Sequence, residues 1–314
     1  MKRQILINYN NLTDVHLAKI TTAAPDFAVS VGADNAEQAE IIFGHASKEM
    51  LSSAKNLKWL HVQSAGVEWY LSPEYGLKES VILTNSAGMH ARSISEHMVG
   101  FTIMLMRHLH SYVKEQTAHN WRYLGGVQSI YQSNITVVGL GGIGSLYASH
   151  CKALGANVVG VVRTARPQIP DCVDKLFSVD MLDSAIVAAD VVALTLPNTA
   201  ETAALFNRER LLKLKKGAFI INIGRGAAIE QPALIELLEN GHLGGAALDV
   251  TTPEPLNADS KLWDLPNVIL TPHISGGGTL PLTSDLIVER FINYLQDYIA
   301  ERPFEKVVDK VLGY

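Results

Sequence analysis

A buried strand that runs into a glycine-rich turn constrains this chain more than any other feature. Residues 135–144 read Ile-Thr-Val-Val-Gly-Leu-Gly-Gly-Ile-Gly, an apolar run followed by Gly-x-Gly-x-x-Gly, and a helical pattern continues to residue 154. In this context Gly139 permits the tight turn, Gly141 lets the backbone approach a pyrophosphate, and Gly144 lets the helix pack close to the strand. The helix N-terminus would offer unpaired N–H groups to the phosphates. The motif therefore predicts a βαβ unit that binds a dinucleotide.

Short apolar runs alternate with helical stretches along nearly the whole chain, which is the pattern of a parallel sheet covered on both faces. We predict a first series of strands at residues 4–9, 26–31, 41–44, 57–62 and 81–84. A second series is predicted at residues 135–139, 157–163, 191–196, 218–223, 245–250 and 267–271. Helices are predicted at residues 143–154, 208–214, 232–239 and 281–300.

The length of 314 residues predicts two domains, because one ordinary core rarely grows so large. The amphipathic last helix, 281–300, follows the whole second series, so it can cross back to the first domain. We therefore predict an α/β fold with two doubly wound parallel-sheet domains. A Rossmann cofactor domain over residues 96–282 is inserted into a flavodoxin-like substrate domain, which is discontinuous and comprises residues 1–95 and 283–314.

Between the two series, apolar residues recur at helical spacing from Ile94 through Met98 and Phe101 to Leu109. This pattern predicts one helix from about Arg92 to Glu115, roughly 35 Å long at 1.5 Å per residue. A helix this long and apolar is expected to pack against more than one surface. Two compatible interpretations are a spine between the domains and, in addition, a dimer interface.

Composition narrows the class of protein. The net charge of −5 provides no overall basic field for nucleic acid or anionic lipid. Cys151 and Cys172 are too few for a disulfide framework and are interpreted as reduced thiols. No histidine clusters with cysteines or carboxylates at metal-ligand spacing, so no metal site is predicted. With only short apolar stretches and no apolar leader, we expect a cytoplasmic protein with no nucleic-acid or membrane partner.

The strand after the glycine turn indicates which dinucleotide is preferred. An NAD site usually places Asp or Glu at the end of this strand, where it binds the ribose 2′-hydroxyl. Here the strand is followed by Arg163, Thr164 and Arg166, and no carboxylate occurs before Asp171. Arginine can bind a 2′-phosphate with paired donors, so NADP is the predicted cofactor and NAD remains possible. The alternative is a pair of solvated loop arginines.

Three further segments each follow a predicted strand of the second series. They are Asn222-Ile-Gly-Arg225-Gly226, Leu248-Asp249-Val-Thr-Thr-Pro-Glu254-Pro and Thr271-Pro-His273. Ligands of doubly wound sheets bind beyond the carboxyl ends of the strands. Arg225, Glu254 and His273 are therefore expected to converge beside a nicotinamide.

The chemistry of hydride transfer to a ketone suits these residue types. The alkoxide that forms needs a proton, which a histidine poised near neutral pH can donate. A carboxylate on the other ring nitrogen favours the imidazolium and fixes the ring. An arginine can hold a substrate carboxylate and polarise the carbonyl. Each residue alone has an ordinary structural or surface explanation, so the prediction rests on their order and placement together.

The order of Gly-x-Gly-x-x-Gly, Gly-Arg-Gly, Leu-Asp-Val with Glu-Pro-Leu, and Thr-Pro-His closely resembles the D-isomer-specific 2-hydroxyacid dehydrogenases, which include glyoxylate/hydroxypyruvate reductases. The resemblance is strong over residues 93–278 and looser before them. It implies reduction of a small 2-oxo acid to a D-2-hydroxy acid, with the NADP-preferring members the nearer match. It also implies a homodimer formed through the cofactor domain.

The resemblance assigns roles residue by residue. Arg225 binds the substrate carboxylate and carbonyl, His273 is the acid/base, and Glu254 is its partner. Substrate binding is predicted for Ser64, Ala65, Gly66 and Val67, whose backbone N–H groups hold the carboxylate, together with Arg225 and His273. Cofactor binding is predicted for Gly139, Gly141, Gly142, Ile143, Gly144, Arg163, Thr164, Arg166, Leu196, Pro197, Thr202, Ile223, Asp249, His273 and Gly276. Asp249 is expected to bind the nicotinamide carboxamide.

Two alternatives remain open at this point. The first is a dinucleotide-sensing interaction protein that resembles the transcriptional corepressors built on this scaffold, which can keep the same three catalytic residues. The chain lacks long disordered or basic extensions, which counts against it. The second is a relative that oxidises formate or phosphite, donors that are normally used with NAD.

Overall fold

The computed structural model describes residues 2–164, 167–276, 278, 280–311 and 313. The chain forms two compact units. Unit 1 comprises residues 1–90 and 277–314, and unit 2 comprises Ala91–Gly276. The boundaries predicted after residues 95 and 282 lie a few residues downstream of these. The first boundary lies after residue 90 rather than 95 because a single helix begins at Ala91 and packs as a whole within unit 2.

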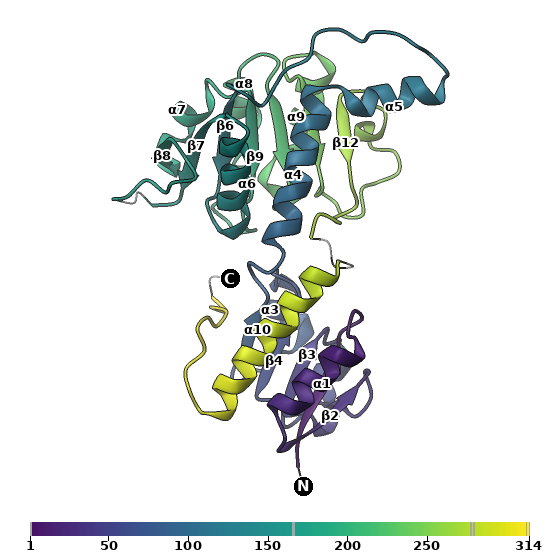
Figure 1. Cartoon of the computed structure of the whole chain (residues 1–314), viewed down its shortest axis with the longest axis vertical. Coiled ribbons are helices and arrows are strands. Elements are labelled where there is room, and N and C mark those ends of the chain that lie inside the picture. Colours follow the sequence, from purple (N-terminus) through teal and green to yellow (C-terminus); the bar gives the residue numbers. More distant parts are fainter. Residues whose placement is uncertain (1, 165–166, 277, 279, 312, 314) are drawn as a thin grey trace. The chain divides into compact units, whose positions relative to one another are not determined.

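Unit 1 is built on one parallel sheet of five strands in the order β2-β1-β3-β4-β5 (Figure 1). The strands are β1 (Arg3–Asn8), β2 (Phe27–Val31), β3 (Ile41–Gly44), β4 (Trp59–Val62) and β5 (Ile82–Asn85). Its helices are α1 (Asp14–Ala23), α2 (Lys48–Ser53), α3 (Glu68–Leu71) and α10 (Pro281–Ile299). This strand order is that of flavodoxin-like sheets, as predicted.

Helix α10 returns to unit 1 because its buried face completes the core there. Apolar side chains of α10 join those of α1 and the sheet in one buried cluster. Phe291 of α10 stacks on Phe43 of β3 with ring centroids 4.2 Å apart, and on Trp59 of β4 at 5.2 Å. A second cluster, with Met50 and Leu51 of α2, covers the opposite face of the sheet. The discontinuous domain that the sequence predicts is thus held together by aromatic packing.

Unit 2 is built on a parallel sheet of seven strands in the order β12-β11-β10-β9-β6-β7-β8 (Figure 1). The strands are β6 (Asn134–Val138), β7 (Asn157–Val162), β8 (Lys175–Ser178), β9 (Val191–Leu194), β10 (Phe219–Asn222), β11 (Gly245–Leu248) and β12 (Val268–Leu270). Its helices are α4 (Ala91–Met106), α5 (Leu109–Thr117), α6 (Gly142–Ala153), α7 (Leu182–Ile186), α8 (Arg208–Leu212) and α9 (Gln231–Glu239). Counted from β6, this order is the Rossmann order 3-2-1-4-5-6 with one strand added, so the predicted fold class is confirmed.

Two buried clusters cover the faces of this sheet. Apolar side chains of α4 and α6 pack on one face, and those of α7, α8 and α9 pack on the other. In the described part of the chain, short 3-10 helices occur at Ala36–Gln38, Pro73–Tyr75, Val179–Met181, Gly226–Ala228 and Lys261–Trp263. None of the helices in the described ranges combines the length and the apolar character needed to cross a membrane.

The predicted helix from Arg92 to Glu115 is wrong as a continuous element, because α4 ends at Met106 and α5 starts at Leu109. His108 adopts a left-handed backbone with φ of 54° at the break. The carbonyl of Met104 contacts the His110 ring at 3.2 Å, and the carbonyl of Met106 accepts the N–H of Gln128 at 2.8 Å. The final carbonyls of α4 are therefore satisfied without a further helical turn.

Candidate active site

The predicted catalytic and cofactor-binding residues of unit 2 follow strands of one sheet. His273 follows β12, Asp249 and Glu254 follow β11, Arg225 follows β10, Leu196 and Pro197 follow β9, Gly139 follows β6, and Arg163 follows β7. All strand pairs in this sheet are parallel, so these segments leave it at the same edge. The strand order reverses between β9 and β6, the position at which doubly wound sheets bind ligands.

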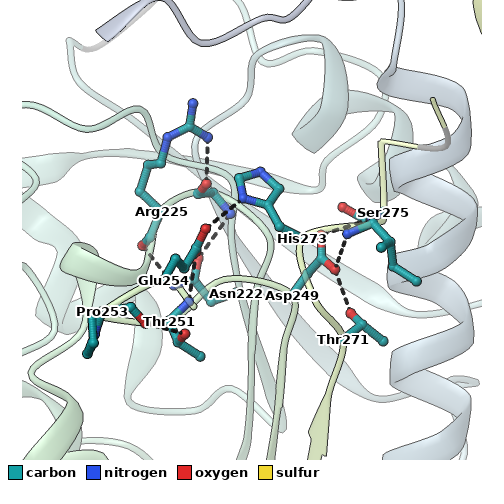
Figure 2. Close-up of polar contacts among 11 residues, drawn as sticks. Asn222, Arg225, Asp249, Thr251, Pro253, Glu254, Thr271, His273 and Ser275 are labelled. Atoms are coloured by element: carbon teal, nitrogen blue, oxygen red, sulfur yellow. Dashed lines mark hydrogen bonds and ion pairs between the residues drawn. The ribbon is translucent and has the colours of Figure 1, made fainter. Parts of the chain in front are cut away.

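The centre of the site is a histidine–carboxylate pair. Nδ1 of His273 lies 2.9 Å from Oε2 of Glu254 (Figure 2). The other carboxylate oxygen, Oε1, accepts the backbone N–H of Thr251 at 3.0 Å, which orients the carboxylate. Because a carboxylate only accepts hydrogen bonds, Nδ1 carries the hydrogen of the neutral ring. The His273 side chain is 49% exposed, and Nε2 is the ring nitrogen at which it can take up or release a proton.

The loop that carries His273 is held on the buried carboxylate of Asp249. Oδ1 of Asp249 accepts the hydroxyl of Thr271 at 2.5 Å and the N–H of Ile274 at 2.9 Å. Oδ2 accepts the N–H of Ser275 at 3.0 Å. His273 itself has a φ of 55°, a left-handed conformation that is uncommon for residues other than glycine. The donors on either side of His273 therefore hold its backbone in an unfavourable conformation.

Asp249 is 1% exposed, yet it is well suited to remain ionised. Burial alone raises the pKa of its carboxyl group. Hydrogen bonds from Ser275, Thr271 and Ile274 outweigh that effect, and the net pKa is lowered. The two carboxylate oxygens thus accept hydrogen bonds from both the start and the end of the His273 loop. The structure thus shows Asp249 as an anchor of the His273 loop, and its contact with a nicotinamide carboxamide stays a prediction.

Arg225 is placed by two close backbone approaches. A Cβ at Gly226 would lie 2.0 Å from the carbonyl oxygen of Thr251, and one at Gly224 would lie 2.5 Å from that of Leu196. Only glycines therefore allow the segment to pass between the loops after β9 and β11. The Arg225 Nη1 donates to the carbonyl of Gly224 at 2.8 Å. Its guanidinium and the His273 ring extend to the same side of the strand ends (Figure 2).

The glycine turn has the shape that a dinucleotide pyrophosphate requires. A Cβ at Gly144 would lie 1.9 Å from the carbonyl oxygen of Gly139, so α6 can approach β6 only with glycine there. Gly139 has a φ of 100°. At Gly141, in contrast, a Cβ would meet nothing within 4 Å, so the backbone is open on that side. Helix α6 begins at Gly142, and the N–H groups of a helix's first turn have no partner within the helix and can bind phosphate. The residues present fit the cofactor that the motif predicts.

The remaining predicted cofactor residues follow β7, β9, β10 and β12 or begin α6. Arg163 and Thr164 are exposed after β7, and Nη1 of Arg163 lies 3.9 Å from Oε2 of Glu201, an exposed ion pair of little strength. The hydroxyl of Thr202 donates to the carbonyl of Pro197 at 2.7 Å, so it closes the loop after β9. Ile223 is buried, Leu196 and Gly276 are half-buried, and Gly142 and Ile143 start α6. The prediction for Arg166 lies outside the described residues.

In unit 1 the predicted substrate loop, residues 64–67, connects β4 to α3. Every carbonyl of the loop accepts a hydrogen bond: that of Ser64 from the N–H of Ser86 at 3.1 Å, that of Ala65 from Nδ2 of Asn85 at 2.8 Å, that of Gly66 from the Ser64 hydroxyl at 2.7 Å, and that of Val67 from the N–H of Tyr70 at 3.0 Å. Among the described residues, no hydrogen bond donated by a backbone N–H of residues 64–67 is found. Their contact with a substrate carboxylate stays a prediction.

Sequence reasoning missed the residues that orient the site. Asn222 accepts the N–H of Gly224 at 3.0 Å and donates to the carbonyl of Arg225 at 2.9 Å. Thr271 links Asp249 to His97, whose Nε2 lies 3.4 Å from the threonine hydroxyl. The available signal was the polar residue at the carboxyl end of each strand, Asn222 and Thr271. Which of their neighbours they contact follows only from the fold.

Comparison with known proteins agrees with this geometry. Residues 99–275 match the family model described as "D-isomer specific 2-hydroxyacid dehydrogenase, NAD binding domain". Among curated relatives, glyoxylate/hydroxypyruvate reductase B of Pectobacterium atrosepticum is 32% identical over 238 residues, which cover 74% of this chain and 73% of that protein.

Solved structures extend the likeness to the whole chain. A D-isomer specific 2-hydroxyacid dehydrogenase family protein from Aeromonas salmonicida superposes with a TM-score of 0.86 at 30% identity, covering 99% of this chain and 100% of that one. An NADPH-dependent glyoxylate/hydroxypyruvate reductase from Sinorhizobium meliloti, in complex with NADP and sulfate, superposes with a TM-score of 0.84 at 26% identity and covers 100% of both chains.

Proposed function

The chain belongs to the D-isomer specific 2-hydroxyacid dehydrogenase family, and we propose that it reduces a small 2-oxo acid to the D-2-hydroxy acid with NADPH. Membership makes it an oxidoreductase that uses a nicotinamide dinucleotide. The observation that carries the finer proposal is the 2.9 Å contact between His273 and Glu254 at the ligand-binding edge of the unit 2 sheet. Bound NADPH supplies the hydride, and the chain supplies the proton and the substrate contacts.

His273 is proposed as the acid/base. In the reductive direction its imidazolium donates the Nε2 proton to the alkoxide oxygen, and in the oxidative direction the neutral ring removes the proton of the alcohol. Glu254 holds Nδ1 and stabilises the positive charge of the protonated ring. The N–H of Thr251 fixes the carboxylate in turn. The loop anchored on Asp249 keeps the ring in one position relative to the strand ends.

Arg225 is proposed as the group that binds the substrate carboxylate and polarises its carbonyl. A guanidinium presents paired donors that match a carboxylate and are always charged. Charge that develops on the carbonyl oxygen is stabilised by such a donor in the transition state. The loop of residues 64–67 is proposed as a second carboxylate site, because its carbonyls are occupied while, among the described residues, its N–H groups donate no hydrogen bond.

The proposed cofactor is NADP, with NAD as the alternative. Gly139, Gly141, Gly142, Ile143 and Gly144 would hold the pyrophosphate, and Arg163 with Thr164 would bind the 2′-phosphate. Support comes from the exposed guanidinium after β7 and from the NADP-bound reductase of Sinorhizobium meliloti, which shares the fold at 26% identity. Leu196, Pro197, Thr202, Ile223, Asp249 and Gly276 complete the proposed contacts.

A homodimer through unit 2 is also proposed. The face formed by α5 and the segment after it displays large apolar side chains, with Val113 at 59%, Trp121 at 104% and Tyr123 at 76% exposure. Apolar surface of this kind is usually covered by a partner. A Val113→Asp, Trp121→Ser double variant should sediment as a monomer while the wild type sediments as a dimer. A wild-type monomer at micromolar concentration would contradict the proposal.

The function is tested by initial rates with glyoxylate, hydroxypyruvate, pyruvate, and branched and aromatic 2-oxo acids, each with NADPH and with NADH. We expect turnover of at least one acid, faster with NADPH. Folded protein that binds NADPH and reduces none of them would refute the substrate class and favour the interaction-protein alternative. Oxidation of formate or phosphite with NAD in the same assay would instead favour the second alternative.

A further inference from the structure

A fully buried histidine lies beneath the substrate loop of unit 1 and has no part in the proposed chemistry. His61 is on β4, three residues before the loop, and none of its surface is exposed. Its Nδ1 lies 2.7 Å from the hydroxyl of Thr84, and its Nε2 lies 3.2 Å from the hydroxyl of Ser86. With both ring nitrogens engaged and no path to solvent, His61 cannot exchange a proton with a substrate.

The neighbouring hydrogen bonds determine which nitrogen carries the hydrogen. The Ser86 hydroxyl donates to the carbonyl of Val62 at 3.1 Å, so it can only accept from His61, and Nε2 must be the donor. At the other end, the indole N–H of Trp59 donates to the Thr84 hydroxyl at 2.8 Å. Thr84 is then free to donate its own hydrogen to Nδ1. Every donor and acceptor in this series of hydrogen bonds is satisfied only when His61 is the neutral Nε2–H tautomer.

This series of hydrogen bonds ends at the backbone of the substrate loop. Ser86, which receives the His61 hydrogen, donates its own backbone N–H to the carbonyl of Ser64 at 3.1 Å. The adjacent Asn85 donates to the carbonyl of Ala65 at 2.8 Å. Residues 85–86 thus hold the first two carbonyls of the loop and thereby determine where the following N–H groups point.

We propose that His61 is a positioning residue for the substrate loop and acts on it through Ser86. The inference rests on the proposed function, in which the loop N–H groups bind the substrate carboxylate. An aromatic wall of Phe43, Trp59, Phe291 and Tyr294 surrounds the ring and leaves it a single orientation. Side chains of Thr84 and Ser86 fix its two nitrogens. The ring therefore acts as a rigid spacer between the core of unit 1 and the loop.

The first test compares Ser86→Ala with Tyr294→Phe. Each removes one hydroxyl from the same core, but only Ser86→Ala breaks the link from His61 to the loop. We expect Ser86→Ala to raise KM for the 2-oxo acid about tenfold, because a buried donor loses its acceptor and the loop loosens. The NADPH Kd should not change, and Tyr294→Phe should leave KM within about twofold.

A second pair tests the histidine itself. His61→Leu should raise KM for the 2-oxo acid. His61→Gln keeps an amide N–H near the position of Nε2, so its KM should stay close to that of wild type. A purely structural role would instead lower the thermal stability of both variants and leave KM alone. Equal KM values for wild type, His61→Leu and Ser86→Ala, together with unchanged amide exchange in the loop, would overturn the proposal.

Amide hydrogen exchange gives a readout that does not depend on turnover. The amides of residues 65–67 should exchange faster in Ser86→Ala than in wild type, and at the wild-type rate in Tyr294→Phe. Unchanged exchange in Ser86→Ala would contradict the positioning role. Faster exchange in a protein that reduces no 2-oxo acid would support the positioning role and refute the proposed function. Faster exchange with an unchanged KM would show that the loop does not bind substrate.

Discussion

The hydroxyl of Thr271 donates to the carboxylate of Asp249 across 2.5 Å, and this contact ties the start of the His273 loop to the end of β11. The same carboxylate accepts two backbone N–H groups that follow His273. His273 is thereby held from both sides in a left-handed conformation. Its position depends on Asp249 even though the two side chains do not contact each other in the contacts described.

The first prediction removes one side of this anchor. Thr271→Val keeps the shape of the side chain but not the hydroxyl, and we expect kcat to fall about 10- to 100-fold because the acid/base is misplaced. Thr271→Ser keeps the hydroxyl and should stay within about threefold of wild type. Steady-state kinetics of both variants, with NADPH affinity measured separately, check the prediction. Equal kcat values for the two would mean that the hydroxyl does not position His273.

The glycine turn gives a second prediction, which separates binding from folding. Gly141→Ala adds a methyl group that meets no protein atom within 4 Å, so thermal stability should not change. The methyl group would occupy the side that the pyrophosphate approaches, and we expect the NADPH Kd to rise at least about tenfold.

Gly100→Ala is the matched control for this change. Gly100 lies in α4, where a Cβ also meets nothing within 4 Å. The added methyl should leave NADPH affinity unchanged and raise stability slightly, since alanine is the better helix former. A Gly141→Ala variant with wild-type affinity by fluorescence titration would show that the pyrophosphate lies elsewhere.

Cofactor preference provides the third prediction. Arg163→Asp replaces the cation after β7 with the carboxylate typical of NAD sites, so the ratio of kcat/KM for NADPH to that for NADH should fall about 100-fold. Lys216→Asp makes the same charge change before β10, at the opposite edge of the sheet, and should leave the ratio unchanged. If the ratio of kcat/KM for NADPH to that for NADH is the same in wild type and Arg163→Asp, the arginine does not bind the 2′-phosphate.

The fourth prediction concerns acid stability. Burial lowers the pKa of His61 to about 3, with a smaller contribution in the same direction from Arg290. The folded protein thus keeps His61 neutral, whereas the unfolded chain takes up a proton below its usual pKa of about 6.5. The contribution of His61 to stability is present above pH 6.5 and is lost as the pH falls from 6.5 toward 3.

Between pH 7.5 and pH 5 this linkage should lower the free energy of unfolding by about 2 kcal/mol. Urea unfolding at the two pH values measures the difference. In His61→Gln, which has no titrating ring at this position, the difference should shrink by the same amount. A His61→Gln variant with the full pH dependence of wild type would show that other groups cause the loss.

The alternation of apolar runs and helical stretches was sufficient to predict both sheets, because strands buried on both faces leave continuous apolar runs. Strand β8, Lys175–Ser178, was not predicted, since it lies at the sheet edge and none of its residues is fully buried. The break between α4 and α5 was also missed. The apolar spacing continues through His108, and only contacts from His110 and Gln128 reveal that the helix ends before it.

The candidate site, like the fold, was predictable only in part. The placement of Arg225, Glu254 and His273 at one edge of the sheet was predictable, because each lies in a short motif after a strand of one parallel sheet. The anchoring of the His273 loop on Asp249 was not predictable. Nor was the series of hydrogen bonds that links Trp59 through His61 to the backbone of Ser64. Both depend on hydrogen bonds between residues far apart in the sequence, whose partners become known only when the strands are placed side by side.

In the proposed reaction His273, paired with Glu254, transfers the proton in the reduction of a 2-oxo acid. The most direct test measures kcat for the best 2-oxo acid with wild type, His273→Gln and Glu254→Gln, at saturating NADPH and with NADPH binding confirmed for each. We predict a loss of about 10²- to 10⁴-fold for His273→Gln and a smaller loss for Glu254→Gln. A His273→Gln enzyme that binds NADPH and turns over at the wild-type rate would show that His273 is not the acid/base.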